Sequence, residues 1–566
     1  GNRSHLLKGL SITTHLLTNP TSHSFLSKVF PAAYKTENEN ITSKWQLPNF
    51  LILFADDLGM GDLSCYGHPT QMTPNLDKLA AEGIRFTQWY SAFHICTPSR
   101  AAMMTGRLPI RSGLAGSNWA GSVLTSSSRG GLPLNETTIA EALKQKNYAT
   151  MAIGKWHLGQ QGKFLPTAQG FDEYYGIPYS DDMGNSAWRP NALDVPLPLL
   201  HSTPMNITIV EQPTDLNLLT NRYAAKGVQF IKEKSAAKIP WLLYMAFNHV
   251  HTPSFVGIQH CNTTLRGRFG DALAEMDDAI GQIMSVVNKA RADENTVVFF
   301  TSDNGPWLIQ RLQSGSAGLL RDGKTTTWEG GFREPGIIRW KGKIKAGRIS
   351  TEVVTTYDIF PTSLSLAGIS LPSDRHIDGK DISEILFSDT AKTPHECIFY
   401  YKGIDSPGCL QDDKHHVCSG LWAVRCGAYK AHFYTRNYNS PVVKLHDPPL
   451  IFQIEKDPGE SYPINQNTDE YKNVKGKVEA EVSKHKQSLM PVPNQFLAGS
   501  DISVAVCCDP DSKIRYPTHP KCTCNPENYK VDVCEMDYGQ GNSISTTITS
   551  TPRAVKFEDL QEQITL

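Results

Sequence analysis

The chain has no long hydrophobic run and no excess of charge of either sign. Its longest apolar stretches, residues 50–55 (FLILFA) and 241–247 (WLLYMAF), are much shorter than the about 20 apolar residues that a spanning helix needs. Lysine and arginine total 55 while aspartate and glutamate total 56, so net charge does not favour nucleic acid or an anionic membrane surface. We therefore expect a soluble protein without a membrane span and without a nucleic-acid partner.

A signal peptide is also missing, but the sequence begins without methionine, so this absence excludes nothing. Two features point to the secretory pathway and hence to a lysosomal or secreted protein. Nine of the twelve cysteines follow residue 390. Five glycosylation sequons are present, at Asn2, Asn40, Asn135, Asn206 and Asn262.

The last five cysteines lie in a C-terminal segment with few apolar residues to pack. A disulfide cluster explains this composition, because small segments without a hydrophobic core depend on such crosslinks. Zinc is the alternative, but no histidine completes the usual Cys/His spacing in this segment. We predict disulfides among Cys507, Cys508, Cys522, Cys524 and Cys534.

The composition and the hydrophobic pattern along the sequence predict four regions. Residues 1–47 are polar and lack a sustained period, which indicates an irregular extension. Residues 48–390 alternate apolar strands with helices, as expected for an α/β domain with a mostly parallel sheet. Short alternating strands in 391–505, with a helix near 470–488, predict a smaller antiparallel domain. Residues 506–566 form the Cys-rich tail.

Two helices of the α/β region are predicted from local signals. Residues 73–86 indicate a helix with Thr73 as its N-cap and Pro74 at the first helical position. Residues 269–290 carry apolar side chains at steps of three and four, namely Leu273, Met276, Ile280, Ile283 and Val287.

Polar residues follow each of four predicted strands, directly or within a few positions. In an open α/β sheet, ligands bind outside the carboxyl ends of the strands, so these residues are expected to meet at one edge. Each of these residues alone could also belong to an ordinary turn, and each histidine could also be a core residue. Together they predict a site made from Asp56 and Asp57, Lys155 and His157, His249 and His251, and Asp303 and Asn304.

The residue types in this set indicate its chemistry. Asp56, Asp57, Asp303 and Asn304 offer only oxygen ligands, which suit Ca²⁺ or Mg²⁺ better than zinc. A metal cation with a rim of cationic or proton-donating groups is typical of a site for a tetrahedral oxyanion, either sulfate or phosphate. The candidates for that rim are Arg100, Lys155, Lys324, His157 and His251.

The most specific segment is residues 94–113, HICTPSRAAMMTGRLPIRSG. Its Cys-x-Pro-Ser-Arg matches the motif that a dedicated enzyme reads when it oxidises cysteine to formylglycine, and Pro98 and Ser99 open a helix. A buried structural cysteine fits poorly beside Arg100 at a helix N-terminus. A cysteine phosphatase needs five residues between cysteine and arginine, whereas three separate Cys96 from Arg100.

These motifs resemble the formylglycine-dependent sulfatase family, most closely its arylsulfatase and galactosamine-6-sulfatase members. The resemblance covers residue 48 to the tail and is carried by residues 54–83, 96–113, 127–143, 154–159, 170–180, 301–306 and 323–335. It implies an alkaline-phosphatase-like fold: a large mixed sheet flanked by helices, with residues 48–390 as the catalytic domain, and a smaller four-stranded antiparallel domain.

The resemblance also implies roles for individual residues. Asp56, Asp57, Asp303 and Asn304 would hold Ca²⁺ together with the formylglycine made from Cys96. One hydroxyl of the hydrated aldehyde would attack sulfur, and the other would later expel sulfate. Arg100 and Lys155 would orient this group, Ser180 would hydrogen-bond nearby, and His157 would accept a proton. Lys324 and His251 would contact the sulfate and the leaving group.

Some positions depart from the family pattern. Asp322 stands where a relative has a cysteine, so a disulfide of that relative is expected to be absent. Residues 185–220 and 405–445 match no relative closely, which leaves the sulfated small molecule or glycoconjugate substrate open. His446 stands where a relative has a histidine close to the substrate, and it is a further candidate for substrate binding. The resemblance adds a formylglycine-generating enzyme as a maturation partner, and a homo-oligomer stays open.

Two other functions fit parts of the sequence. A phosphate or phosphonate monoester hydrolase would share the fold and the metal corner, although phosphatases of this fold usually carry two zinc ions with extra histidine ligands. A catalytically inactive, carbohydrate-binding relative is the other reading. It is disfavoured because every mapped catalytic position holds the expected residue.

Overall fold

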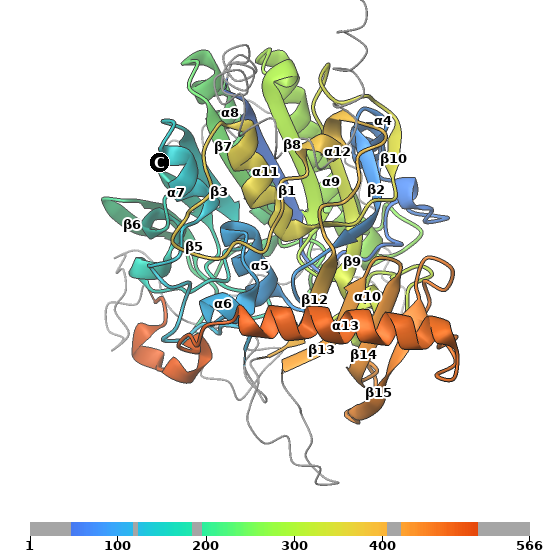
Figure 1. The fold of residues 1–566 in the computed structure, drawn as a ribbon. Helices are drawn as coiled ribbons and strands as arrows, with labels where there is room; N and C mark the ends of the chain where they lie inside the picture. Colours follow the sequence, from blue (N-terminus) through green and yellow to red (C-terminus); the bar gives the residue numbers. More distant parts are fainter. Residues whose placement is uncertain (1–46, 117–122, 184–194, 404–419, 508–566) are drawn as a thin grey trace, which may run out of the picture.

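The computed structural model describes residues 47–116, 123–183, 195–403 and 420–507 (Figure 1). An 11-stranded mixed sheet and a four-stranded antiparallel sheet organise this part of the chain. The predicted extension 1–47 and tail 506–566 lie almost wholly outside the described residues, and the predicted domain boundaries stay predictions. None of the helices in the described ranges combines the length and the apolar character needed to cross a membrane.

Four parallel strands form the middle of the large sheet, in the order β8, β1, β7, β3. The margins are mixed, because β9 runs antiparallel to both β8 and β2, and β5 runs antiparallel to β4 and β6. The strands are β1 (Asn49–Ala55), β2 (Ile84–Tyr90), β3 (Ala149–Gly154), β4 (Glu173–Gly176), β5 (Leu199–Thr203), β6 (Asn206–Glu211), β7 (Trp241–Ala246), β8 (Thr296–Ser302), β9 (Arg333–Arg339), β10 (Arg348–Ser350) and β11 (Val354–Thr355).

Helices cover both faces of this sheet, as β1 illustrates. Phe50 and Phe54 face one core with α5 (Cys96–Thr105), α7 (Ile139–Lys144), α11 (Ile359–Leu366) and α12 (Ser383–Phe387). Leu51 and Leu53 face the other core with α4 (Pro74–Ala81), α8 (Leu216–Ala236) and α9 (Arg268–Lys289). Because successive strand residues point to opposite faces, a fully apolar strand can bury both. The predicted flanked mixed sheet is confirmed.

The helix predicted for residues 73–86 is too long. α4 ends at Ala81, and residues 84–90 form β2 instead. A side chain at Gly83 would lie 2.3 Å from the Ile338 carbonyl oxygen, so the chain turns closely against β9 there. The segment after Gly83, IRFTQWY, is rich in residues that favour strands. Thr73 precedes α4 as predicted but makes no side-chain cap; its hydroxyl bonds Ser64 and Asp77.

The smaller sheet is four-stranded and antiparallel, as predicted from the resemblance. Its strands are β12 (Cys397–Lys402), β13 (Gly420–Cys426), β14 (Tyr429–Thr435) and β15 (Lys444–Gln453). α13 (Asp469–Gln487) lies across it in Figure 1 and packs Tyr471 and Val478 on its apolar face. A disulfide, Cys397–Cys426, joins β12 to β13.

Buried charges join the smaller sheet to the loop before β9. The Lys430 ammonium on β14 lies 2.9 Å from the Glu329 carboxylate, in α10 (Glu329–Phe332), and 3.3 Å from that of Glu460. His432 lies 2.6 Å from Glu460. Burial alone would raise the pKa of Glu329, but Lys430 and nearby arginines lower it to about 2. Lys430 therefore balances two carboxylates that lie fully out of water.

Replacing Lys430 by methionine tests this balance. Lys430→Met removes the cation that the two buried carboxylates share, and we expect it to lower the free energy of unfolding by about 3–5 kcal/mol. Urea unfolding followed by tryptophan fluorescence measures the change. Lys477→Met, on the exposed side of α13, is the matched control and should leave the midpoint nearly unchanged. Equal midpoints for both variants would contradict the assigned role of Lys430.

Candidate active site

The four adjacent parallel strands deliver the predicted polar residues to one edge of the large sheet. Asp56 and Asp57 follow β1, and Asp303 and Asn304 follow β8. Lys155 follows β3, with His157 two residues later, and the segment after β7 carries His249 and His251. Backbone hydrogen bonds fix the segments that follow these strands. Lys155 N–H donates to Ala246 O at 2.9 Å, and Asp56 N–H donates to His249 O at 2.9 Å.

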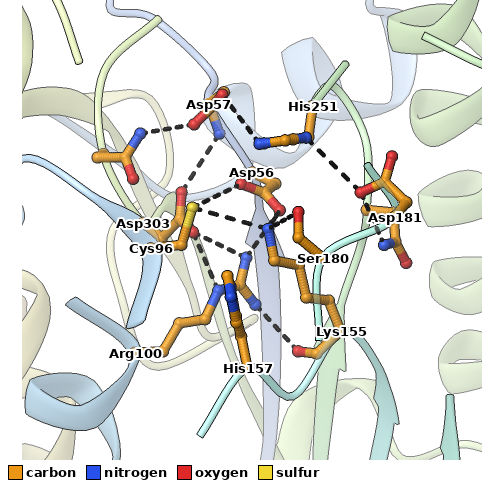
Figure 2. A network of polar contacts seen from close by, with 12 residues as sticks. Asp56, Asp57, Cys96, Arg100, Lys155, His157, Ser180, Asp181, His251 and Asp303 are labelled. Carbon is orange, nitrogen blue, oxygen red and sulfur yellow. Dashed lines mark hydrogen bonds and ion pairs between the residues drawn. The ribbon is translucent and has the colours of Figure 1, made fainter. Parts of the chain in front are cut away.

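Asp56 lies at the centre of this edge between two cations (Figure 2). The Lys155 ammonium lies 2.5 Å from Asp56 Oδ2, and Arg100 Nη2 lies 3.2 Å from the same oxygen. Arg100 also binds Asp303, with Nε and Nη2 at 3.0 and 2.8 Å from Oδ2. All four side chains are fully buried. The two carboxylates are thus bridged by one guanidinium.

Cys96 is the first residue of α5, and its sulfur faces this cluster. Sγ lies 3.6 Å from Asp56 Oδ1, 3.6 Å from Lys155 Nζ and 3.4 Å from Lys324 Nζ. The side chain is 2% exposed. Burial raises the pKa of the Cys96 thiol well above its usual value despite the two lysines. An unmodified Cys96 is therefore a thiol, which is a weak nucleophile.

Asp57 completes the carboxylate group on the other side. Lys324 Nζ lies 2.6 and 2.8 Å from its two oxygens, and Asn304 Nδ2 donates to Oδ1 at 2.7 Å. The Asp57 N–H donates to Asp303 Oδ1 at 3.2 Å, so the segments after β1 and β8 are tied directly. Asn304 Oδ1 is buried and accepts no hydrogen bond from the described residues.

Charge coupling shifts the acidity of these groups in opposite directions. Burial would raise the pKa of Asp56, but Lys155 and Arg100 hold it well below its usual value. Burial and the neighbouring Asp56 charge raise the pKa of Asp303 to about 6. Burial would lower the pKa of Lys155, yet Asp56 raises it above its usual value. The lysines therefore remain positively charged beside Cys96.

His251 reaches the cluster, whereas His249 does not. His251 Nδ1 donates to Thr252 O at 2.6 Å, which leaves Nε2 3.6 Å from Asp57 Oδ2. His249 Nε2 lies 2.8 Å from Glu275 and 2.9 Å from the Thr220 hydroxyl, within the core. Only one of these two predicted histidines therefore reaches the site.

His157 and Ser180 lie beside the lysine that contacts Asp56. Ser180 Oγ accepts from Lys155 Nζ at 3.0 Å. His157 Nε2 donates to Leu124 O at 2.9 Å, so Nδ1 carries the lone pair, and this buried nitrogen has no partner among the described residues. Burial, with the charges of Lys155 and Arg100, holds the pKa of His157 well below its usual value. A neutral imidazole can accept a proton.

The oxygen atoms of this cluster fit a hard cation. Asp56, Asp57, Cys96 and His251 each offer one ligand atom, and these atoms lie within 4.8 Å of one another. Asp303 and Asn304 adjoin them, and the unpaired Asn304 oxygen is an acceptor without a donor. Three carboxylates and one amide oxygen are the donor chemistry of Ca²⁺ or Mg²⁺. His251 is the one nitrogen donor that the predicted metal set did not include.

Two residues near the site were not singled out from the sequence. Asp181 Oδ1 lies 3.7 Å from His251 Nδ1 and accepts from Asn248 at 3.2 Å. Burial raises the pKa of Asp181 to about 6. The Trp307 ring lies 5.7 Å from the His251 ring and 4.9 Å from Lys324 Nζ. Asp181 directly follows the matched segment 170–180, and Trp307 directly follows the matched segment 301–306; these positions were the available signals.

Comparison with known proteins agrees with this geometry. The chain matches the family described as Sulfatase over residues 48–369 and the family described as C-terminal region of aryl-sulfatase over 393–524. It is 39% identical to arylsulfatase A of Homo sapiens over 516 residues, covering 85% of this chain and 94% of the relative. It is 40% identical to N-acetylgalactosamine-6-sulfatase of Canis lupus familiaris over 477 residues, covering 79% and 87%.

A solved structure is similar over the same length. The PsFucS1 sulfatase from Pseudoalteromonas sp. superposes with a TM-score of 0.69 at 29% identity, over 80% of this chain and 93% of that chain. The family resemblance and the alkaline-phosphatase-like fold predicted from the sequence are confirmed. The chain belongs to the sulfatase family and is a sulfatase of the arylsulfatase type, an enzyme that hydrolyses sulfate esters.

Proposed function

We propose that the chain cleaves sulfate esters with a formylglycine made from Cys96 and with one Ca²⁺ held by Asp56, Asp57, Asp303 and Asn304. The observation that carries this proposal is the position of Cys96 Sγ, within 3.4–3.6 Å of one carboxylate and two lysine ammonium groups. A hydrated aldehyde in that position would supply the nucleophilic hydroxyl that a buried thiol cannot. Bound Ca²⁺ would supply Lewis acidity and a fixed place for the sulfate oxygens.

The cations around Cys96 serve the negative charge of the sulfate group. Lys324 and Lys155 both lie within 3.6 Å of Sγ, so each can reach an oxygen of a sulfate brought to this atom. Arg100 contacts no open space, because it is fully buried between Asp56 and Asp303. It therefore orients the carboxylates and Lys155, to whose carbonyl it donates at 3.0 Å.

Two histidines divide the proton transfers. The Nδ1–H of His251 donates to Thr252 O and Nε2 faces the cluster, so the doubly protonated imidazolium is the form that can protonate the departing alcohol from Nε2. His157 presents an unpaired Nδ1 and is held neutral by burial and by nearby cations, so it is suited to take a proton. One proton donor and one proton acceptor in different surroundings are what a two-step hydrolysis requires.

The two alternative functions remain distinguishable. Phosphate and phosphonate monoesters have the same tetrahedral shape, so aryl phosphate turnover must be compared with that of the matching aryl sulfate. Among the described residues the oxygen-ligand set of one metal, without a second group of histidine ligands, favours sulfate. An inactive carbohydrate-binding relative would need no such arrangement of charged, fully buried groups, which are costly to bury.

Passage through the secretory pathway is part of the proposal. Asn135, Asn206 and Asn262 are exposed, as glycosylation requires. Cys397 pairs with Cys426, and Cys261 and Cys507 are also disulfide-bonded, which indicates an oxidising compartment. The remaining predicted tail cysteines lie outside the described residues. Lysosomal or extracellular residence, a formylglycine-generating partner and a homo-oligomer remain proposals.

Mass spectrometry of the peptide containing Cys96 is the first test of the nucleophile. In protein from a eukaryotic secretory host, we expect the tryptic peptide containing Cys96 to carry an aldehyde that reacts with a hydrazide. Cys96→Ala should lose at least about 10³-fold in aryl sulfate turnover while remaining folded, since covalent catalysis is removed. The wild type should cleave an aryl sulfate faster than the matching aryl phosphate. An unmodified Cys96 in active enzyme would refute the proposed nucleophile.

The role of His251 is tested by varying the leaving group. His251→Ala should lower kcat by about 10²–10⁴-fold for an alkyl or sugar sulfate, whose alcohol needs a proton. For 4-nitrophenyl sulfate, whose leaving group is stable as an anion, the loss should be much smaller. His249→Ala, from the core side of the same loop, should show no dependence on the leaving group. An equal loss for both esters would remove His251 as the proton donor.

Metal binding is tested without relying on activity. Adding Ca²⁺ to chelator-treated protein should raise Tm. The free energy of unfolding should increase by about 2.7 kcal/mol when free Ca²⁺ is about 100 times Kd. Asn304→Leu removes the unpaired oxygen and should abolish much of this Ca²⁺-dependent rise. Asn295→Leu, outside the site, should retain it. A wild-type Tm that does not respond to Ca²⁺ or Mg²⁺ would contradict the metal proposal.

A further inference from the structure

A second pair of cations lies beside the active site and takes no part in the reaction proposed above. Lys402 ends β12, and Arg436 follows β14. Lys402 Nζ and Arg436 Nη2 donate to the carbonyl oxygen of Thr325 at 3.3 and 3.1 Å, and Arg436 also donates to the Thr325 hydroxyl at 2.9 Å. Thr325 directly follows Lys324, whose ammonium lies 3.4 Å from Cys96 Sγ.

These two cations have no anionic partner among the described residues. The ring of Trp422 lies 4.6 Å from Lys402 Nζ. Asp322 is the carboxylate that acts on Arg436, but the two form no ion pair. Arg436 Nε is buried and donates to nothing in the described chain. Burial and the Arg436 charge lower the pKa of Lys402 well below its usual value. Each cation thus stands in an environment that disfavours its charge.

A buried histidine adjoins the same place. His94 is 2% exposed, and neither ring nitrogen has a hydrogen-bond partner in the described residues. Its carbonyl accepts from Thr325 N–H at 3.0 Å, so His94 and both cations contact the same residue, Thr325. Among the described residues, Arg436 Nε and both ring nitrogens of His94 are therefore buried polar atoms without a hydrogen-bond partner.

The buried cations of the active site and of the smaller sheet differ from this pair, because they have carboxylate partners. In the active site, Arg100 pairs with Asp303, Lys155 with Asp56 and Lys324 with Asp57. Lys430, at the smaller sheet, has two glutamates. Since the fold supplies carboxylates to these buried cations, a pair left without one is suited to an anion from outside. Lys402 and Arg436 are each half-buried among the described residues, so neither is sealed in the core.

We propose that Lys402, Arg436 and His94 form a second anion subsite, and that the preferred substrate carries a second anionic group next to the sulfate ester that is cleaved. The group is a carboxylate or a further sulfate, as found on acidic sulfated sugars. The subsite rests on the proposed sulfatase reaction, because its position is defined relative to Lys324 and Cys96. The charged Arg436 guanidinium can donate charge-assisted hydrogen bonds to either oxyanion.

Matched aryl sulfates test this subsite. Three substrates are compared: (carboxymethyl)phenyl sulfate, its methyl ester, and the sulfomethyl analogue, each as 2-, 3- and 4-isomers so that the distance between the charges is scanned. The measured quantity is the ratio of kcat/KM for an anionic substrate to kcat/KM for the ester. Using a ratio cancels any effect that a substitution has on Lys324 through the Thr325 carbonyl.

In the wild type, at least one anionic isomer should exceed the ester by on the order of tenfold, mainly through KM. Lys402→Met and Arg436→Gln should each bring this ratio towards one, while Lys402→Arg should retain it. Lys146→Gln, an exposed lysine before β3 at the opposite edge of the sheet, is the charge-matched control and should leave the ratio unchanged. The anion that the subsite prefers is the one, carboxylate or sulfonate, whose substrate has the larger ratio of kcat/KM to that of the ester.

Two results would overturn the subsite. A wild-type ratio near one for every isomer would show that no second anion is recognised. A ratio that survives both Lys402→Met and Arg436→Gln would show that these cations only hold the Thr325 carbonyl. Failure of the wild type to hydrolyse the methyl ester is a separate outcome, which would count against the proposed reaction itself and remove the subsite with it.

Discussion

Three carboxylates share one buried corner of this molecule, and the arrangement of the active site follows from keeping them charged there. Asp56 and Asp303 are wholly inaccessible and Asp57 is 3% exposed. Such a group is stable only when each charge is compensated at short distance. Arg100, Lys155 and Lys324 provide that compensation from three separate segments of the chain. Two of these cations, Lys155 and Lys324, also lie within 3.6 Å of Cys96 Sγ, so the groups that make the corner stable also define where an oxyanion can bind.

Much of this corner was predictable because its determinants are local. An apolar strand followed at once by Asp56-Asp57 or Asp303-Asn304 indicates both the strand and the end at which its ligands appear. The Cys96 motif is likewise contiguous. His249 and His251 could not be separated in this way, because the loop after β7 turns one into the core against Glu275 and the other towards Asp57. Sequence spacing does not record that turn.

Other features depend on contacts between distant segments, and these were missed. The close approach of Gly83 to β9 ends α4 early, and no signal within residues 73–86 reveals the position of β9. The sequence indicated a smaller antiparallel domain but not its contact with the catalytic loop. Glu460 accepts the Glu329 N–H at 2.6 Å, and Arg321 donates to Glu460 O at 3.0 Å. The segment after β15 thereby holds both ends of the loop that carries Lys324.

The position of Cys96 sets an order of events in the life of the chain. All ten residues of α5 are buried, and Cys96 lies at its first position, covered by Asp56, Lys155 and Lys324. Another protein could not contact this segment in the folded enzyme without removing a whole helix from the core. The proposed oxidation of Cys96 must therefore occur while residues 94–113 are still extended, before the large sheet closes around them. Maturation would then compete in time with folding, and a chain that folds too early would remain permanently unconverted.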